Sequence, residues 1–311
     1  ICLNMLPKDE QEGKHGEVAG AYLLQITPKQ AKVTTHDPEG ITNGLTTLYW
    51  MLREGGGACD CGTFTDAPAC EHRGILLDSS RHFFDVETIK GMIEQCTLRK
   101  LNRLHWHLSD DQGYRLESGR FPRLNEIGSW RTEPDASRYG GFYTKAQIRD
   151  IVSYAGARGM QIIPEIDVPG HVSAIVAAYP HLSCSGEELE VKNMFGIHER
   201  ILCAGKDVVL QFVCCLLDEV MELFPYPYFH SGGDEAPKGE WKKCPACQAR
   251  IKAEGLKDEE ALQAWFTKKV LEHLQEKGRT AVCWNECMKS GELDARAVVQ
   301  YWDEEEDAGY C

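Results

Sequence analysis

The feature that most constrains the fold is a regular alternation of short apolar strands and amphipathic helices between residues 73 and 302. The connections are long enough to return the chain to the same end of a sheet, so we expect the strands to run parallel in an α/β fold. Six runs have the length and composition of buried strands, namely residues 74–78, 101–108, 160–166, 228–230, 281–285 and 298–302.

Helix-start signals support this pattern. Asp85, Asp207 and Asp258 each stand where an apolar helical repeat begins, and an aspartate there can accept hydrogen bonds from the free N–H groups of the first turn. Thr144 and Gln147 have the spacing of a capping box. We therefore predict helices between the strands.

Polar clusters stand at the carboxyl ends of the strands, for example at residues 109–111, 167–171 and 234–235. This placement fits a (β/α)8-type barrel better than an open sheet, because barrel loops converge on one pocket at that end. We expect residues 73–311 to form this barrel with six of its eight strand units, incomplete at the C-terminal side.

Residues 1–72 have a different pattern. They contain two strand-like runs at 21–26 and 31–35 and one helical run at 41–52, which is too little for an independent core. We predict part of a small α+β domain, followed by a connector rich in Gly, Cys and Pro at residues 55–70.

The composition excludes some partners. A net charge of −14 disfavours binding to nucleic acid or to an anionic membrane, because either would repel the chain. No apolar run approaches the ~20 residues that a membrane-spanning helix needs. The chain opens at Ile1 without the pattern of a signal peptide, and no feature indicates an oligomeric state.

The fourteen cysteines are placed unlike a disulfide framework. Cys96, Cys214, Cys215 and Cys283 fall in predicted helices or strands, where cysteine serves as a small apolar residue. This favours reduced thiols and a cytoplasmic location.

Cys244 and Cys247 form a CxxC pair without a second pair at zinc-finger spacing. A loop staple or plain structural thiols therefore fit better than a metal site. We expect no metal and no cofactor, and activity that survives a chelator.

The most informative stretch runs from Tyr228 to Lys238, where an aromatic run meets Gly232-Gly233 and then Asp234-Glu235. Glycines allow a tight turn, which would place both carboxylates at the end of a strand. An isolated sequence of this kind is more often an acidic surface turn. The clusters at the other strand ends favour a functional site.

Four motifs in this order resemble the family 20 glycoside hydrolases, the β-N-acetylhexosaminidases. They are the runs Arg73 to His82, His105 to Gly113, Pro164 to His171 and His230 to Ala236. The resemblance implies an exo-acting retaining hydrolase that releases terminal β-linked N-acetylglucosamine or N-acetylgalactosamine from glycans or oligosaccharides.

The resemblance also implies roles for the two carboxylates. Glu235 would protonate the glycosidic oxygen, and Asp234 would orient the 2-acetamido group of the substrate, whose carbonyl closes an oxazolinium ring. The spacing agrees with this division, because adjacent side chains cannot flank a sugar ring from opposite faces at the ~5 Å or more of a two-carboxylate mechanism.

Further residues match supporting positions of the family. The resemblance implies that Arg73 holds sugar hydroxyls and that Asp110 and His171 support the acid, with Asp167 as a partner of His171. A surface salt bridge for Arg73 and a structural role for His171 are the alternatives.

Two tryptophans at strand ends, Trp284 and Trp302, match aromatic walls around the acetamido pocket. Core packing is the alternative for both. The family also carries a tyrosine, a tryptophan and a glutamate on its last two strands, which this sequence does not reach. A non-catalytic or impaired sugar-binding remnant is therefore the alternative function.

Overall fold

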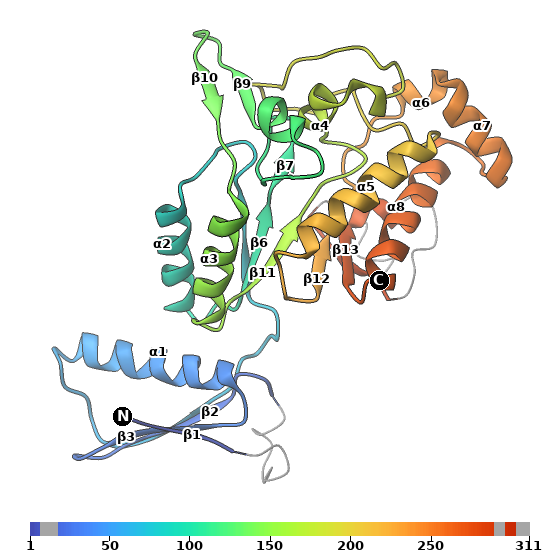
Figure 1. Ribbon diagram of the computed structural model, residues 1–311. Coiled ribbons are helices and arrows are strands. Elements are labelled where there is room, and N and C mark those ends of the chain that lie inside the picture. The colour runs from blue at the N-terminus through green and yellow to red at the C-terminus, as the bar shows by residue number, and fades with distance from the viewer. Residues whose placement is uncertain (7–17, 289–295, 303–311) are drawn as a thin grey trace. The chain divides into compact units, whose positions relative to one another are not determined.

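The computed structural model describes residues 1–6, 18–288 and 296–302 (Figure 1). Its largest sheet has six strands in the order β14-β13-β12-β11-β6-β5, and the printed registers from β11 to β14 are all parallel. Strands that follow each other along the chain therefore lie next to each other in the sheet, as in a (β/α) barrel. These strands are β5 (Gly74–Asp78), β6 (Arg103–His107), β11 (Gln161–Glu165), β12 (Tyr228–His230), β13 (Thr280–Trp284) and β14 (Val298–Gln300).

Helices connect most of these strands, as predicted. Two of the expected caps form, because Asp85 Oδ1 accepts from the Thr88 N–H at 2.7 Å and Asp258 Oδ1 accepts from the Ala261 N–H at 2.9 Å. The capping box of residues 144 and 147 also forms. The helices are α2 (Val86–Thr97), α3 (Lys145–Gly156), α4 (Ser173–Ala178), α5 (Asp207–Met221), α6 (Gly239–Lys243), α7 (Pro245–Glu254) and α8 (Glu259–Glu276).

The N-terminal part forms a four-stranded sheet in the order β1-β3-β2-β4 with one helix, α1 (Pro38–Glu54). Its core consists of Tyr22, Leu24, Ile26, Val33 and Leu48. The predicted connector at 55–70 contains a strand, β4, because the alternation of residues 62–66 pairs with β2. The strands are β1 (Cys2–Met5), β2 (Tyr22–Ile26), β3 (Ala31–Thr35) and β4 (Gly62–Asp66).

Several small elements between β6 and α5 were not predicted from the sequence. Two of them are two-stranded antiparallel hairpins, β7–β8 and β9–β10. Their strands are too short for any periodicity to show. These elements are β7 (Ser109–Asp110), β8 (Gly113–Tyr114), β9 (Trp130–Thr132), β10 (Arg138–Gly140), and the single turns η1 (Leu124–Gly128) and η2 (Pro180–Leu182). A third turn, η3 (Asn285–Met288), follows β13.

A fully buried arginine, Arg115, fixes these loops. Its guanidinium makes five hydrogen bonds of 2.6–3.2 Å, all to backbone carbonyls, which belong to Ser79, Ser80, Gln112, Ser129 and Gly141. Burial and the nearby Arg131 lower the pKa of Arg115 to about 10, so the group stays charged at neutral pH. Gly113 allows this packing, since a Cβ there would lie 2.2 Å from the guanidinium carbon.

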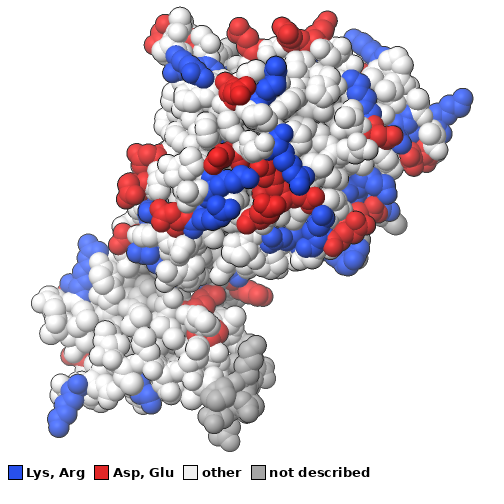
Figure 2. Space-filling view, in the orientation of Figure 1, with Lys and Arg blue, Asp and Glu red and all other residues white. Residues whose placement is uncertain are grey.

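The surface of the described part carries mixed charge. On the face in Figure 2, Lys and Arg side chains lie beside Asp and Glu side chains, without a broad basic area among the described residues of that face. Within the described ranges, no helix combines the length and the apolar character needed to cross a bilayer.

The role of Arg115 can be tested by Arg115→Lys. Lysine keeps the charge but lacks the planar fork, so several of the five buried carbonyls lose their donor. We expect the free energy of unfolding, measured with urea, to fall by on the order of 3 kcal/mol. The exposed Arg120→Lys is the matched control and should change it little. Equal unfolding midpoints for both variants would contradict this role.

Candidate active site

The carboxyl ends of β6, β11, β12 and β13 meet at Glu165, the last residue of β11, which is fully buried. Its Oε2 lies 2.8 Å from His105 Nε2 and 2.6 Å from His107 Nδ1. Its Oε1 lies 3.3 Å from His230 Nδ1 and accepts a 2.9 Å hydrogen bond from Trp284 Nε1. One carboxylate therefore contacts side chains from three other strands.

The charges in this cluster are strongly coupled. Burial alone would raise the pKa of Glu165, but the imidazoles of His107, His230 and His105 hold it well below its usual value. Burial would lower the pKa of His107, but Glu165 and Asp110 raise it well above its usual value. Burial lowers the pKa of His230 to about 4 against the opposing effect of Glu165. His107 is thus the imidazolium and His230 the neutral ring.

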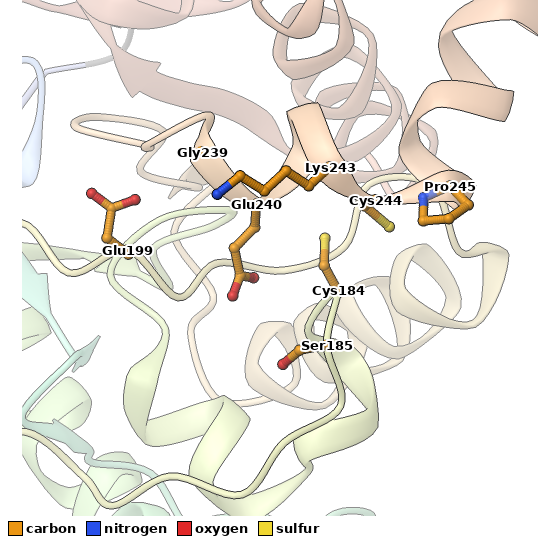
Figure 3. A pocket seen from close by; sticks show the side chains of 8 residues that line it. All are labelled: Cys184, Ser185, Glu199, Gly239, Glu240, Lys243, Cys244 and Pro245. Carbon is orange, nitrogen blue, oxygen red and sulfur yellow. The ribbon is translucent and has the colours of Figure 1, made fainter.

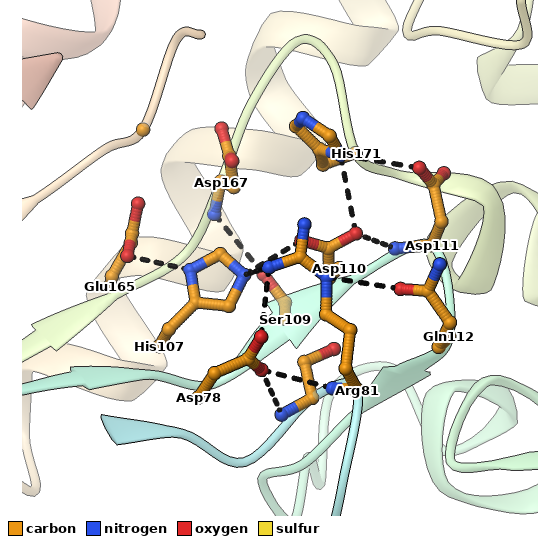
Figure 4. A network of polar contacts seen from close by, with 12 residues as sticks. Asp78, Arg81, His107, Ser109, Asp110, Asp111, Gln112, Glu165, Asp167 and His171 are labelled. Atoms are coloured by element: carbon orange, nitrogen blue, oxygen red, sulfur yellow. Dashed lines mark hydrogen bonds and ion pairs between the residues drawn. The ribbon is translucent and has the colours of Figure 1, made fainter. Parts of the chain in front are cut away.

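From His107 the network continues to Asp110 and Arg81 (Figure 4). Asp110 Oδ2 lies 2.8 Å from His107 Nε2 and 2.5 Å from Arg81 Nη2. Arg81 also contacts Asp78 Oδ2 at 2.9 Å through Nη1 and donates to Gln112 Oε1 at 3.2 Å through Nε. Although burial opposes it, hydrogen bonds from His107 and His171 lower the pKa of Asp110. Asp110 is therefore an anion with a cationic partner on each side.

His171 connects this network to the adjacent carboxylates. Its Nδ1 lies 3.2 Å from Asp110 Oδ1 and 3.3 Å from Asp111 Oδ2. On the other side of the ring, Nε2 lies 3.8 Å from Asp234 Oδ2 and 3.3 Å from Glu235 Oε2. Burial would lower the pKa of His171, but the hydrogen bonds to Asp110 and Asp111 raise it to about 12. His171 therefore presents a positive charge to Asp234 and Glu235.

Asp167 and Asp234 form a second coupled pair. Burial and the charge of Asp234 raise the pKa of Asp167 well above its usual value. Burial also raises the pKa of Asp234, but His171 and a hydrogen bond from Asp167 oppose that rise. Both pKa values are raised, so the pair favours one shared proton over two adjacent negative charges. Asp167 Oδ1 meanwhile accepts from the Gly233 N–H at 2.9 Å.

The backbone after β12 turns sharply to present the two carboxylates. Gly232 and Gly233 have φ of 68° and 106°, values that disfavour any residue with a Cβ. A Cβ on Gly232 would also lie 1.8 Å from Asp167 Oδ1. Glu235 itself has φ of 43°, and its N–H donates to Glu286 Oε2 at 2.7 Å. Glu286 therefore holds Glu235 in a strained conformation, which is a common feature of functional sites.

The two predicted tryptophans differ in exposure. Trp284 is buried, and its ring lies 4.6 Å from that of His230. Trp302 is 51% exposed and makes an edge-on contact with Trp284 at 6.3 Å between ring centroids. Trp284 thus combines a core position with a hydrogen bond to Glu165, and Trp302 is the ring that a ligand can reach.

The structure corrects the assignment of the arginine. Arg73 directly precedes β5, at the amino end of the strand, where it pairs with Glu39 at 2.6 Å and donates to the Lys100 carbonyl. Arg81 follows the carboxyl end of the same strand and contacts Asp110. The motif contains one arginine before the strand and one after it. Only the second, Arg81, lies at the end where the carboxylates gather.

Sequence reasoning left other members of the site without a role. His105, His107, Glu165 and His230 lie inside the quoted motifs but alternate with apolar residues in buried strands, so their pattern resembles that of core positions. Glu286 lies outside every motif, and no local signal marks it.

Several groups of three in this network could hold a metal ion, for example His107 with Asp110 and Asp167. In each group, however, histidine and carboxylate side chains already contact one another as ion pairs or hydrogen bonds. Within the described residues, these contacts account for the geometry without an ion.

Comparisons with known proteins identify the family of this chain. Residues 70–310 match the catalytic domain of glycosyl hydrolase family 20. A β-hexosaminidase of Porphyromonas gingivalis is 47% identical over 237 residues, which cover 76% of this chain and 30% of that protein. A solved β-N-acetylhexosaminidase of Bacteroides fragilis superposes with a TM-score of 0.83 at 37% identity, over 91% of this chain and 56% of that one.

The exo-β-N-acetylglucosaminidase of Vibrio harveyi, solved in complex with N-acetylglucosamine, also superposes with a TM-score of 0.83. It is 34% identical, over 93% of this chain and 48% of that one. This chain thus spans less than two thirds of each of the three relatives. The solved structures confirm the expected fold, part of a (β/α) barrel preceded by an α+β part. With the match over residues 70–310, they show that the chain belongs to glycosyl hydrolase family 20.

Proposed function

We propose that this chain carries the catalytic centre of an exo-acting, retaining β-N-acetylhexosaminidase in which the substrate supplies the nucleophile. The observation that carries this proposal is the pair Asp234 and Glu235, adjacent in sequence and both facing the cationic His171. Two neighbouring residues on one turn approach a sugar from the same side. A carboxylate nucleophile acting opposite an acid would have to come from elsewhere.

Burial supports the same conclusion. The other carboxylates that contact His171 or Glu165 in the described network, Asp110, Asp111 and Asp167, are at most 1% exposed, as is Glu165 itself. The side chains of Asp234 and Glu235 are 16% and 31% exposed. Among the described carboxylates around His171 and Glu165, these two are the ones that a substrate can touch.

In the proposed reaction, Glu235 gives its proton to the glycosidic oxygen as the bond from that oxygen to C1 breaks. The acetamido carbonyl oxygen attacks C1 and closes an oxazolinium ring, whose positive charge Asp234 stabilises. Glu235 then takes a proton from water, which attacks C1 and opens the ring. Two inversions at C1 give net retention.

Other side chains of the site fit a 2-acetamido sugar. Trp302 offers an exposed ring against Trp284, which suits the acetamido methyl group. Arg81 and Asp78, whose side chains are 26% and 28% exposed, can bind sugar hydroxyls; this gives Arg81 the role expected of Arg73. The Vibrio harveyi relative was solved in complex with N-acetylglucosamine. This supports glycans that end in N-acetylhexosamine as the substrates of this chain.

The proposal can be tested with Asp234→Asn and Glu235→Gln on two β-N-acetylglucosaminides, one with an activated phenol and one with a sugar leaving group. We expect Asp234→Asn to lower kcat on both by on the order of 10²–10³, as for loss of one preorganised electrostatic contact. Glu235→Gln should lower kcat most on the sugar leaving group, because an activated phenol departs with little proton assistance.

The alternative, a sugar-binding site without turnover, makes a different prediction. The unaltered protein would then bind N-acetylglucosamine in calorimetry but release no phenol from the activated substrate. Equal effects of Glu235→Gln on both leaving groups would instead remove Glu235 as the general acid.

Protonation of Asp234 gives a pH prediction. Asp234 must be ionised, so activity should fall as the pH falls through its pKa. The hydrogen bond from Asp167 lowers that pKa. Asp167→Ala removes the bond and should move the acidic limb of the kcat/KM profile to higher pH.

Asp167→Asn is the matched control, because its amide can still donate to Asp234. It should leave the acidic limb closer to that of the unaltered protein. The measurement is kcat/KM against pH for the three proteins. An acidic limb that is unchanged in Asp167→Ala would contradict the shared proton.

A further inference from the structure

Four cysteines that are distant in sequence lie together in the fold. They are Cys184, Cys203, Cys244 and Cys247, and their sulfur atoms all lie within 4.8 Å of one another. In the sequence, Cys244 and Cys247 look like a single pair; the fold adds Cys184 and Cys203. This cluster lies apart from the side-chain network around Glu165 and takes no part in the proposed reaction.

Three of the sulfur–sulfur distances are those of a tetrahedral site. Cys203 Sγ lies 3.7 Å from Cys244 Sγ and 3.6 Å from Cys247 Sγ, and Cys184 Sγ lies 3.8 Å from Cys247 Sγ. Four thiolates at about 2.3 Å from a central Zn²⁺ stand about 3.8 Å apart at the corners of a tetrahedron. A disulfide would bring two of the sulfurs to about 2.0 Å.

The backbone brings the four residues together from separate segments. Ser183 and Leu202 form an isolated antiparallel bridge, which places Cys184 and Cys203 in neighbouring segments of the backbone. Cys244 is the N-cap of α7, and Cys247 lies in its first turn. The N–H groups at the start of a helix favour thiolates over thiols.

A second set of contacts supports the sulfurs. The Lys206 N–H donates to the Cys203 carbonyl at 3.2 Å, which fixes the turn directly after this thiol. Gly205 packs directly on α7, since a Cβ there would lie 2.3 Å from the Cys247 nitrogen. Trp241 Nε1 also donates to the Leu202 carbonyl at 2.8 Å. The segments that carry the cysteines are thus fixed independently of the thiols.

An ion has a route to the cluster. A surface pocket of about 590 Å³ opens beside it, with Cys184 and Cys244 next to each other on its wall (Figure 3). Glu199, Glu240 and Lys243 also line the pocket, so its wall is polar as well as thiol-bearing. Cys203 and Cys247 are fully buried behind it.

We propose that Cys184, Cys203, Cys244 and Cys247 form a structural zinc site. Four thiolates in tetrahedral array are a closed donor set that leaves no open position for substrate, as in structural rather than catalytic zinc sites. The ion would hold the chain around residues 184–203 to the start of α7. This site is independent of the proposed hydrolase activity, and its test does not depend on turnover.

The first experiment measures metal in the protein, purified under reducing conditions without added metal, by inductively coupled plasma mass spectrometry. We expect one zinc ion per chain, released when a mercurial reagent titrates the thiols. Exchange for Co²⁺ should give the thiolate-to-cobalt absorption of a tetrahedral sulfur site. Removal of zinc should lower the Tm, and Zn²⁺ but not Mg²⁺ should restore it.

Variants identify the ligands. Cys203→Ser and Cys247→Ser should lose the zinc, whereas Cys214→Ser, a half-buried cysteine of α5 outside the cluster, should retain it. If the cluster variants fail to fold, the zinc content and cobalt spectrum of the unaltered protein still decide. Absence of zinc with four thiols open to alkylation, iron in its place, or a disulfide among the four cysteines in unreduced peptides would overturn the proposal.

Discussion

The site depends on one buried carboxylate, Glu165, which interacts with side chains from three other strands of the sheet. A lone charge in such a position would cost several kcal/mol of desolvation. Here the imidazolium of His107 and the N–H of Trp284 compensate for it. The carboxyl ends of β6, β11, β12 and β13 are therefore tied to one point, and displacement of β6, β12 or β13 would remove one of the polar contacts of Glu165.

From that point, alternating charges extend outward to the reacting groups. His107 is followed by Asp110, then by His171, and finally by Asp234 and Glu235, with Arg81 as a second cation on Asp110. The charge of each group in this series favours the opposite charge on the group that follows it. The result is a fixed positive charge at His171 that favours the ionised form of Asp234, while the raised pKa of Asp167 favours a proton on that pair of carboxyls. A stabilised anion at Asp234 is what an oxazolinium intermediate needs.

Much of this could be predicted from the sequence. The strand and helix pattern of residues 74–285 reflects local periodicity and capping, so β5, α2 and α8 form close to where they were predicted. The fold brings Asp234, Glu235, Asp110 and His171, which come from three separate motifs, into one network; their roles stay predictions. The motif match favours Arg73, but the rule that barrel sites lie at the carboxyl ends of strands favours Arg81, because it follows the strand at 74–78 and Arg73 precedes it. Glu286, Arg115 and the partnership of Cys184 with Cys247 depend on contacts between distant segments, which no local pattern encodes.

In the proposed reaction the nucleophile belongs to the sugar, and Asp234 assists it as an anion. The most direct measurement is kcat/KM for aryl β-glycosides whose 2-acetamido group carries none, one, two or three fluorines, with the plain β-glucoside as the end of the series. Fluorine weakens the carbonyl as a nucleophile, so the account predicts a steep fall along the series and essentially no turnover of the glucoside. Comparable rates across the series, or a glycosyl ester trapped on an aspartate or glutamate, would contradict it.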